Sequence, residues 1–185
     1  MYRVPVMTSW SPDLWLRAFE FAAQAHHGQE LPGTDLPYIL HPCSVAMEVS
    51  AAIAARNDVE QPDLALSCAL LHDVAEDTPV GIDLIRKEFG DGVAAGVAAL
   101  SKGPAAGDKA AQMRDSLRRV KEQPPEVWMV KLADRVHNLR SPPPHWTAAK
   151  IAAYREEAEL ILNELGSACP VLSARLRERI SKYGR

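Results

Sequence analysis

Four short stretches of the sequence gather residues that could bind a metal ion and carry out hydrolytic chemistry. They are His41-Pro42, His72-Asp73, Glu76-Asp77-Thr78 and Lys131-Leu132-Ala133-Asp134. Together they supply two imidazoles and four carboxylates, a mixed set of donors that suits a hard or borderline divalent cation such as Mn²⁺ better than a thiolate-binding metal. No cysteine lies in these stretches, so a cysteine-type zinc site is disfavoured. The residues predict a divalent-metal centre with acidic groups beside it.

The spacing of these residues indicates how helices could present them. Residues four apart share one face of a helix, and two pairs near the end of one predicted helix have this spacing: His72 with Glu76, and Asp73 with Asp77. Asp134 and Asn138 repeat the spacing on a later helix and could face the same centre. His41, at the start of an earlier helix, is a further contributor. Each stretch alone is a weak signal, because a single buried histidine is usually a hydrogen-bonded core residue.

Prolines and glycines divide the chain into segments with helical periodicity. Ser11-Pro12-Asp13 has the N-cap, first-turn proline and acidic residue that open a helix. The predicted helices are Pro12–His27, Pro42–Arg56, Pro62 to the stop at Thr78-Pro79, Ile82–Phe89, Val93–Leu100, Lys109–Lys121, Glu126–Arg140, Thr147–Leu165 and Pro170–Tyr183. Gly103 to Gly107 is predicted to be a mobile loop, and no segment reads as a strand. The expected architecture is all-α, a compact set of helices in one domain over residues 1–185.

Composition and charge limit the classes of function. The 185 residues are 47% hydrophobic and 24% charged, as in globular proteins. A net charge of −3 provides no basic surface for a nucleic-acid backbone. The apolar runs are too short for a membrane span or a signal peptide. A cytoplasmic protein with a small-molecule substrate is therefore expected, without nucleic-acid or membrane partners; homo-oligomers remain open.

Three longer stretches resemble the signature blocks of the RelA/SpoT hydrolase domain, a branch of the HD superfamily: HPCSVAMEV, ALLHDVAEDTP and VKLADRVHNLR. The preceding AFEFAAQAHHGQELPGTDLPYILHP is similar to the opening helix and loop of that family, so the resemblance covers about residues 12–165. It implies an HD-domain fold with a metal site in a central cleft. The size resembles that of the single-domain small alarmone hydrolases, which include the metazoan SpoT homologue.

The resemblance also implies a role for each matching residue. The implied metal ligands, for manganese in this family, are His41, His72, Asp73 and Asp134. Glu76 and Asp77 match the acidic pair that orients or deprotonates the attacking water. That role is chemically reasonable, since a metal lowers the pKa of water and a nearby carboxylate can accept its proton.

The implied reaction removes the 3′-pyrophosphate from guanosine tetra- or pentaphosphate, giving GDP or GTP and pyrophosphate. The residues that match the substrate contacts of the family are Lys102, Asn138, Lys150 and Tyr154. Other interpretations exist for two of them, because Lys102 could be a solvated surface lysine and Tyr154 could belong to the core. Lys150 and Tyr154 are four apart and so share a helix face.

The opening loop departs from the family pattern. Alarmone hydrolases usually place an arginine after the HxGQ segment, and it lies against the guanine base; this chain has Glu30-Leu31-Pro32 there. Cation stacking on a planar ring contributes about 1 kcal/mol, so guanine recognition is predicted to be weaker or to use other groups. The alternatives are hydrolysis of another nucleotide, namely the 2′-phosphate of NADPH, an adenine alarmone or a nucleoside phosphate, and a non-catalytic nucleotide-binding protein.

Overall fold

The computed structural model describes residues 10–103 and 108–185. Within these ranges the regular secondary structure is helical, apart from an isolated β-bridge between Glu30 and Pro37, and loops and turns connect the helices. The helices are α1 (Pro12–Ala25), α2 (Leu40–Ala54), α3 (Pro62–Leu71), α4 (Val74–Asp77), α5 (Ile82–Leu100), α6 (Lys109–Lys121), α7 (Pro125–Asn138), α8 (Ala148–Leu165) and α9 (Pro170–Lys182), with a 3₁₀ turn over Gly166–Ala168. The all-α prediction is confirmed.

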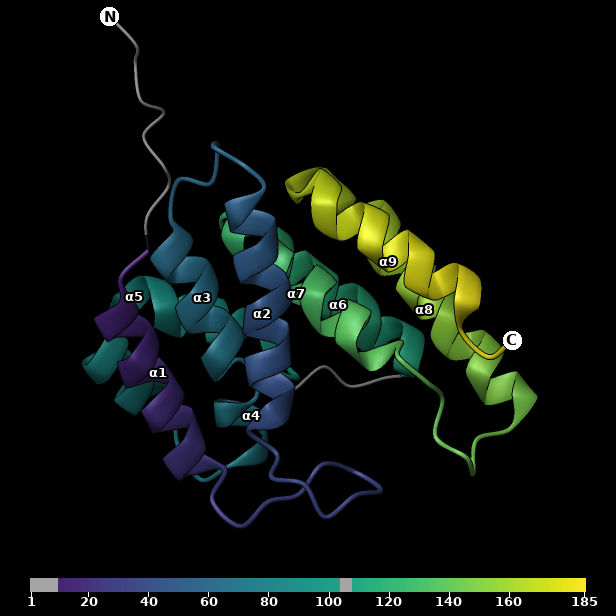
Figure 1. Ribbon diagram of the computed structural model, residues 1–185, viewed down its shortest axis with the longest axis horizontal. Coiled ribbons are helices and arrows are strands. Elements are labelled where there is room, and N and C mark those ends of the chain that lie inside the picture. Colours follow the sequence, from purple (N-terminus) through teal and green to yellow (C-terminus); the bar gives the residue numbers. More distant parts are fainter. Residues whose placement is uncertain (1–9, 104–107) are drawn as a thin grey trace, which may run out of the picture.

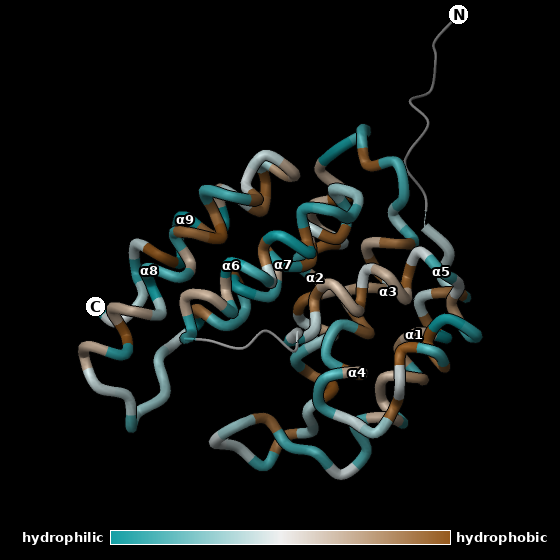
Figure 2. Tube along the Cα trace, turned by 180° about the vertical axis from the view of Figure 1, so that it is seen from behind, coloured by the Kyte–Doolittle hydropathy of each residue, from teal (hydrophilic) through white to brown (hydrophobic). Residues whose placement is uncertain are grey.

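Helix α3 lies between α1 and α2 in Figure 1 and packs against α1, α2, α5 and α7. All of its residues from Ala65 to Leu71 are buried. A helix that is apolar on every side must be enclosed by others. In contrast, hydrophilic and hydrophobic segments alternate along the outer helices α6 and α9 in Figure 2, as expected of helices with one buried face. The C-terminal end of α3, and with it His72, is therefore held in the interior.

Helices α2 and α7 pack against α3 and against each other. The inner face of α7 buries Val127, Val130 and Ala133, which fixes the direction of the neighbouring Asp134. His41 lies in the first turn of α2 and is buried as well. The packing of three apolar helix faces thus brings polar residues from distant parts of the sequence to one place.

The prediction of one continuous helix from Pro62 to Thr78 is wrong. Helix α3 ends at Leu71, and α4 is a separate turn that begins at Val74. Asp73 lies between them with φ −95° and ψ −9°, in the sparsely populated bridge region where many active-site residues are found. Of the two pairs that were expected to share a helix face, Asp73 and Asp77 keep a helical contact, because the Asp77 amide donates to the Asp73 carbonyl at 2.9 Å.

The predicted break between Phe89 and Val93 is a kink at Gly90 within one helix. Gly90 has φ 85° and ψ 172° inside α5, a conformation that residues with a Cβ atom rarely adopt. The segments that were predicted on its two sides, Ile82–Phe89 and Val93–Leu100, are parts of one helix with a bend. Of the predicted loop Gly103 to Gly107, residues 104–107 lie outside the described residues.

Gly96 lies where α5 packs tightly against side chains of α3 and α7. A Cβ atom there would lie 2.6 Å from Cys68 Sγ and 3.0 Å from Val127 Cγ2. Gly96→Ala is expected to destabilise the fold by about 1–3 kcal/mol, because buried side chains must move to admit the methyl group. Urea unfolding followed by circular dichroism measures this change.

Gly92, one turn earlier on α5, is the matched control. A Cβ atom at this exposed glycine would have its nearest contact at 3.9 Å, with Leu64 Cδ1. Gly92→Ala is expected to leave stability unchanged or raise it by up to about 1 kcal/mol, the helix propensity difference between the two residues. Equal effects of the two substitutions would contradict the packing argument.

Candidate metal centre and catalytic cavity

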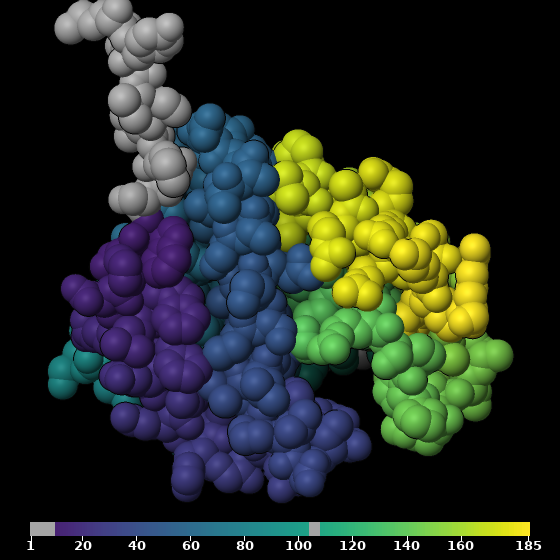
Figure 3. Space-filling model, viewed as in Figure 1, coloured from purple at the N-terminus to yellow at the C-terminus, as the bar shows by residue number. Residues whose placement is uncertain are grey.

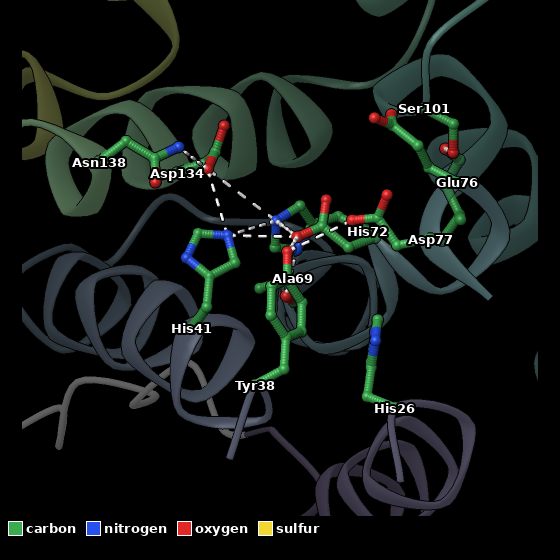
Figure 4. A network of polar contacts seen from close by, with 12 residues as sticks. His26, Tyr38, His41, Ala69, His72, Glu76, Asp77, Ser101, Asp134 and Asn138 are labelled. Carbon is green, nitrogen blue, oxygen red and sulfur yellow. Dashed lines mark hydrogen bonds and ion pairs between the residues drawn. The ribbon is translucent and has the colours of Figure 1, made fainter. Parts of the chain in front are cut away.

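Two histidines and two aspartates from α2, the α3–α4 junction and α7 meet in the interior. Figure 4 labels three of them, His41, His72 and Asp134. His41 Nε2 lies 3.2 Å from His72 Nε2, 3.3 Å from Asp73 Oδ2 and 3.4 Å from Asp134 Oδ1. The ligand atoms of His41, His72 and Asp134 all lie within 4.8 Å of one another. Asp73 adjoins this group through Oδ2, which is 3.2 Å from His72 Nε2. The four metal ligands predicted from the sequence are therefore neighbours in space.

A main-chain hydrogen bond fixes the tautomer of His72. Its Nδ1 lies 2.8 Å from the carbonyl oxygen of Ala69, an acceptor, so Nδ1 carries the proton and donates. In the neutral ring the lone pair is then on Nε2, the atom that faces His41 and the aspartates. A hydrogen bond of this kind, from the far nitrogen of the ring to a carbonyl, is typical of histidines that bind metal ions.

The charges of the cluster stabilise each other. Burial favours the neutral form of His41, but hydrogen bonds with Asp134 and Asp73 outweigh it and raise the pKa of His41 to about 10. Burial likewise acts to raise the pKa of Asp73 and of Asp134, yet the two histidines hold both pKa values well below the usual range. Both carboxylates are therefore ionised, and the two histidines supply the positive charge that compensates them here.

This arrangement fits a divalent cation. Imidazole nitrogens and carboxylate oxygens are common ligands of Mn²⁺, Fe²⁺ and Zn²⁺, and the donor atoms of His41, His72 and Asp134 converge from three different elements. The ionised aspartates match the charge of such an ion. The chain thus has a candidate metal site, and its donor set leaves the identity of the metal open.

The predicted acidic pair lies next to this site, on α4. Glu76 Oε2 accepts a hydrogen bond of 2.7 Å from the Lys102 amide, and the other oxygen of Glu76 pairs with the Lys102 ammonium. Asp77 Oδ2 is 3.4 Å from the hydroxyl of Tyr38. Burial raises the pKa of Asp77, and the negative charges of Asp73 and Glu76 raise it further. The pair consists of one carboxylate neutralised by a lysine and one with increased affinity for a proton.

A cavity of about 680 Å³ opens over the candidate metal site and the predicted acidic pair. Its volume is within the range of small-molecule sites in proteins. Leu31 and Pro32 line one side and Tyr154 of α8 another. In Figure 3 the surface is indented between the blue-violet segment around residues 30–40 and the green segment that leads into α8. Both candidate sites therefore share one cavity that can admit a nucleotide.

Three of the four predicted substrate contacts line this cavity, namely Lys102, Asn138 and Tyr154. The ammonium of Lys102 is largely exposed, and Asn138 Nδ2 donates to Asp134 Oδ1 at 2.6 Å. Lys150 is not among the lining residues; it is exposed, and its ammonium lies 4.2 Å from the ring centroid of Trp146. Substrate contact by Lys150 stays a prediction that this geometry does not support.

The orientation of Tyr154 depends on Arg135, which lies on the neighbouring helix α7. Arg135 is buried, its guanidinium carbon is 4.2 Å from the centroid of the Tyr154 ring, and its Nη1 lies 3.5 Å from Glu157 Oε2. Burial raises the pKa of Tyr154 to about 12, so the phenol keeps its proton. Tyr154 is a fixed, neutral hydrogen-bonding group at the wall of the cavity.

Several polar residues that line the cavity received no role from the sequence, among them Tyr38 and Lys131. Tyr38 donates a hydrogen bond of 2.7 Å to Asp73 Oδ2. Lys131 lines the cavity, and its side chain makes no hydrogen bond or ion pair within the part of the chain that the structure describes. The sequence could have indicated this position, because Lys131 lies three residues before Asp134 and residues three apart share a helix face. Tyr38 has no comparable signal, since it precedes α2 and belongs to no helix.

The model of the HD domain family matches residues 18–171, a range that contains the four predicted metal ligands and the predicted acidic pair. This chain belongs to the HD domain family. None of the helices among residues 10–103 and 108–185 has the length and apolar character needed to cross a membrane.

Relatives of this HD domain extend the match over nearly the whole chain. The protein named guanosine-3′,5′-bis(diphosphate) 3′-pyrophosphohydrolase MESH1 of Danio rerio is 29% identical over 187 residues, which cover 96% of this chain and 98% of that protein. A solved structure, described as a metazoan orthologue of SpoT that hydrolyses ppGpp, superposes with a TM-score of 0.79 at 24% identity and covers 95% of this chain and 98% of that one. The resemblance to RelA/SpoT-type hydrolases is confirmed.

Longer bacterial proteins contain a similar domain. The GTP pyrophosphokinase of Streptomyces coelicolor is 32% identical over 128 residues, 68% of this chain and 14% of that protein. The bifunctional (p)ppGpp synthase/hydrolase SpoT of Escherichia coli is 36% identical over 130 residues, which are 17% of its length. This chain thus corresponds to less than a fifth of the length of these relatives. Their names describe much longer proteins.

Proposed function

We propose that this HD-domain chain is a divalent-metal-dependent phosphohydrolase that removes the 3′-pyrophosphate of guanosine tetra- or pentaphosphate. The observation that carries the proposal is the convergence of the candidate metal site and the acidic pair in a single nucleotide-sized cavity. Relatives that match the chain along nearly its full length are named for this reaction. The proposed place of action is the cytoplasm, and neither nucleic acid nor membrane is a proposed partner.

The proposed metal ion, manganese by analogy with the family, would be held by His41, His72, Asp73 and Asp134. When bound, such an ion supplies Lewis acidity towards phosphate oxygens and makes water a better nucleophile at neutral pH. The hydrogen bond from His72 to the Ala69 carbonyl keeps the Nε2 lone pair directed at the site. Asn138, which donates to Asp134, limits the rotation of that carboxylate.

The remaining chemistry is assigned to side chains around the cavity. Water attacks the phosphorus next to the 3′-oxygen, the bond between that phosphorus and the 3′-oxygen breaks, and the 3′-oxygen takes up a proton. Glu76 is positioned to accept the proton that the water loses, and Asp77, whose pKa is raised by burial and by its acidic neighbours, is suited to hold a proton for the leaving oxygen. Lys102 and Lys131 supply positive charge for the phosphates.

A second nucleotide substrate is favoured by one observation. Leu31 and Pro32 line the cavity in the segment where alarmone hydrolases usually carry a cation against the guanine base. An apolar wall stacks on any planar ring and does not select guanine by hydrogen bonding. Hydrolysis of the 2′-phosphate of NADPH is therefore the second candidate, with adenine alarmones and nucleoside phosphates in the same class.

The decisive experiment is hydrolysis by the purified protein with Mn²⁺, in parallel reactions with guanosine tetraphosphate and NADPH. Release of GDP and pyrophosphate in a 1:1 ratio is the expected result, since one bond is broken for each molecule of substrate. Release of inorganic phosphate from NADPH, with guanosine tetraphosphate left intact, would reject the alarmone and keep the phosphohydrolase. Absence of any product, with nucleotide bound, would favour the non-catalytic binding protein.

A further inference from the structure

The segment between α1 and α2 forms a short hairpin, defined here as residues 29–38, that touches the site at two points. The Tyr38 amide donates to the Gln29 carbonyl at 2.9 Å, and the Leu31 amide to the Leu36 carbonyl at 2.8 Å. Gly33, with φ 81°, allows the tight turn at the tip. Gln29 and Tyr38 are therefore adjacent at the base of the hairpin, while its tip carries Leu31 to the cavity.

Tyr38 is bound to the carboxylate that adjoins both histidines. Its hydroxyl donates to Asp73 Oδ2 at 2.7 Å, and this same oxygen lies 3.3 Å from His41 Nε2 and 3.2 Å from His72 Nε2. The Tyr38 ring is packed between the rings of His26 and His41, with centroid distances of 4.8 Å and 5.7 Å. Figure 4 shows the Tyr38 ring between these two histidines. Because the ring is held on both sides, the hydroxyl has little freedom to leave Asp73.

Gln29 is bound to the main chain at the acidic pair. Its Nε2 donates to the carbonyl oxygen of Asp77 at 2.7 Å, so its Oε1 is the acceptor for the buried Nδ1 of His26, 2.8 Å away. His26 is only 3% exposed and holds the Gln29 amide in this orientation. The hairpin base thus contacts the Asp73 side chain through Tyr38 and the Asp77 backbone through Gln29, and the Tyr38 hydroxyl makes a second, longer contact of 3.4 Å with Asp77 Oδ2.

We infer that Tyr38 and Gln29 are positioning residues with different tasks: Tyr38 orients the Asp73 carboxylate towards the two histidines, and Gln29 fixes the backbone that carries Asp77. Hydrogen bonds that orient a metal ligand typically change metal affinity or activity by about 10–100-fold when removed. The task of Tyr38 concerns metal binding, whereas the task of Gln29 concerns turnover and rests on the proposed function.

Tyr38→Phe tests the first task, because it removes the hydroxyl and keeps the ring that packs between the histidines. Titration of the metal-free protein with MnCl₂ in a calorimeter is expected to show about 10–100-fold weaker binding, and hydrolysis should recover at saturating Mn²⁺. The control is Tyr183→Phe, at a buried tyrosine whose hydroxyl has no hydrogen-bond partner among the described residues. Its Mn²⁺ affinity should equal that of the wild type.

Gln29→Met tests the second task, since methionine has a similar length and makes neither hydrogen bond. We expect unchanged Mn²⁺ affinity and a kcat lowered by about 10-fold that added Mn²⁺ does not restore. Gln24→Met, at an exposed position of α1, is the matched control and should leave kcat unchanged. Circular dichroism of the metal-free variants verifies that each retains its helices.

The roles assigned to Tyr38 and Gln29 can be rejected independently. Wild-type Mn²⁺ affinity in Tyr38→Phe overturns the role of Tyr38, and a loss of affinity in Gln29→Met equal to that in Tyr38→Phe overturns the division between them. If the wild-type protein hydrolyses none of the nucleotides, the proposed function fails. The MnCl₂ titration of Tyr38→Phe then still decides whether its hydroxyl orients Asp73, because that measurement uses no substrate.

Discussion

An Asp134→Asn variant is expected to lose Mn²⁺ binding and hydrolysis together. Asp134 Oδ1 lies 3.4 Å from His41 Nε2 and 4.0 Å from His72 Nε2, and the neighbouring histidines, His41 above all, hold its pKa low despite burial. Asparagine has the same shape but no charge, so it cannot balance a divalent cation. Removing a residue that only hydrogen-bonds to a metal ligand typically weakens metal binding by about 10–100-fold. Because Asp134 is proposed to be a ligand itself, we expect Mn²⁺ affinity to fall by about 100-fold or more.

Calorimetric titration with MnCl₂ and a hydrolysis assay over a range of Mn²⁺ concentrations measure the two losses. Asp91→Asn is the matched control, because Asp91 is on α5 and 92% exposed, in a surface ion pair with Arg86. It should behave like the wild type in both assays. Wild-type Mn²⁺ affinity in Asp134→Asn would contradict the assignment of Asp134 as a ligand, whichever nucleotide is the substrate.

Much of the helical framework could be predicted because its signals are local. Helix α6 begins and ends at the predicted residues, Lys109 and Lys121, with the side chain of Asp108 accepting a hydrogen bond from the Ala111 amide at its start and Pro124 soon after its end. The break between α3 and α4 has no such signal. Its sequence continues the helical pattern, and the interruption at Asp73 accompanies contacts with Tyr38 and His41 that are distant in the sequence.

The candidate site could be predicted as a set of residue types, and less well as a set of contacts. Helical spacing correctly places Asp134 and Asn138 on one face, where they are hydrogen-bonded. It also places Lys150 and Tyr154 together, yet Tyr154 alone lines the cavity, while Lys150 lies against Trp146. Spacing predicts which residues share a face of a helix. Which of them reaches the cavity depends on how α8 packs against the rest of the protein.

The roles of the hairpin residues could not be predicted from the sequence, for a different reason. Gln29 and Tyr38 act on Asp77 and Asp73, which are 48 and 35 residues away in the sequence. No periodicity links such positions, and only the folded hairpin, with its main-chain hydrogen bond between Tyr38 and Gln29, brings them to the same acids. Positioning residues of this kind emerge from tertiary structure.

A Glu76→Gln variant is expected to retain Mn²⁺ and lose turnover. The side chain of Glu76 is mostly buried and is held by both the amide and the ammonium of Lys102. Glutamine can keep the hydrogen bond to that amide through its carbonyl oxygen, but it cannot accept a proton from water. Because a positioned general base contributes about 10²–10⁴-fold to the rate, kcat should fall by that factor.

The Mn²⁺ titration separates this variant from Asp134→Asn. Glu76 is not among the three residues whose ligand atoms converge, so its replacement should leave Mn²⁺ affinity unchanged, and Glu60→Gln, at an exposed position outside the cavity, should change neither quantity. If Glu76→Gln lost the metal as fully as Asp134→Asn, the acid would have to be a ligand rather than a base. If it kept both the metal and wild-type kcat, the base would have to be Asp77, which is the remaining carboxylate on α4.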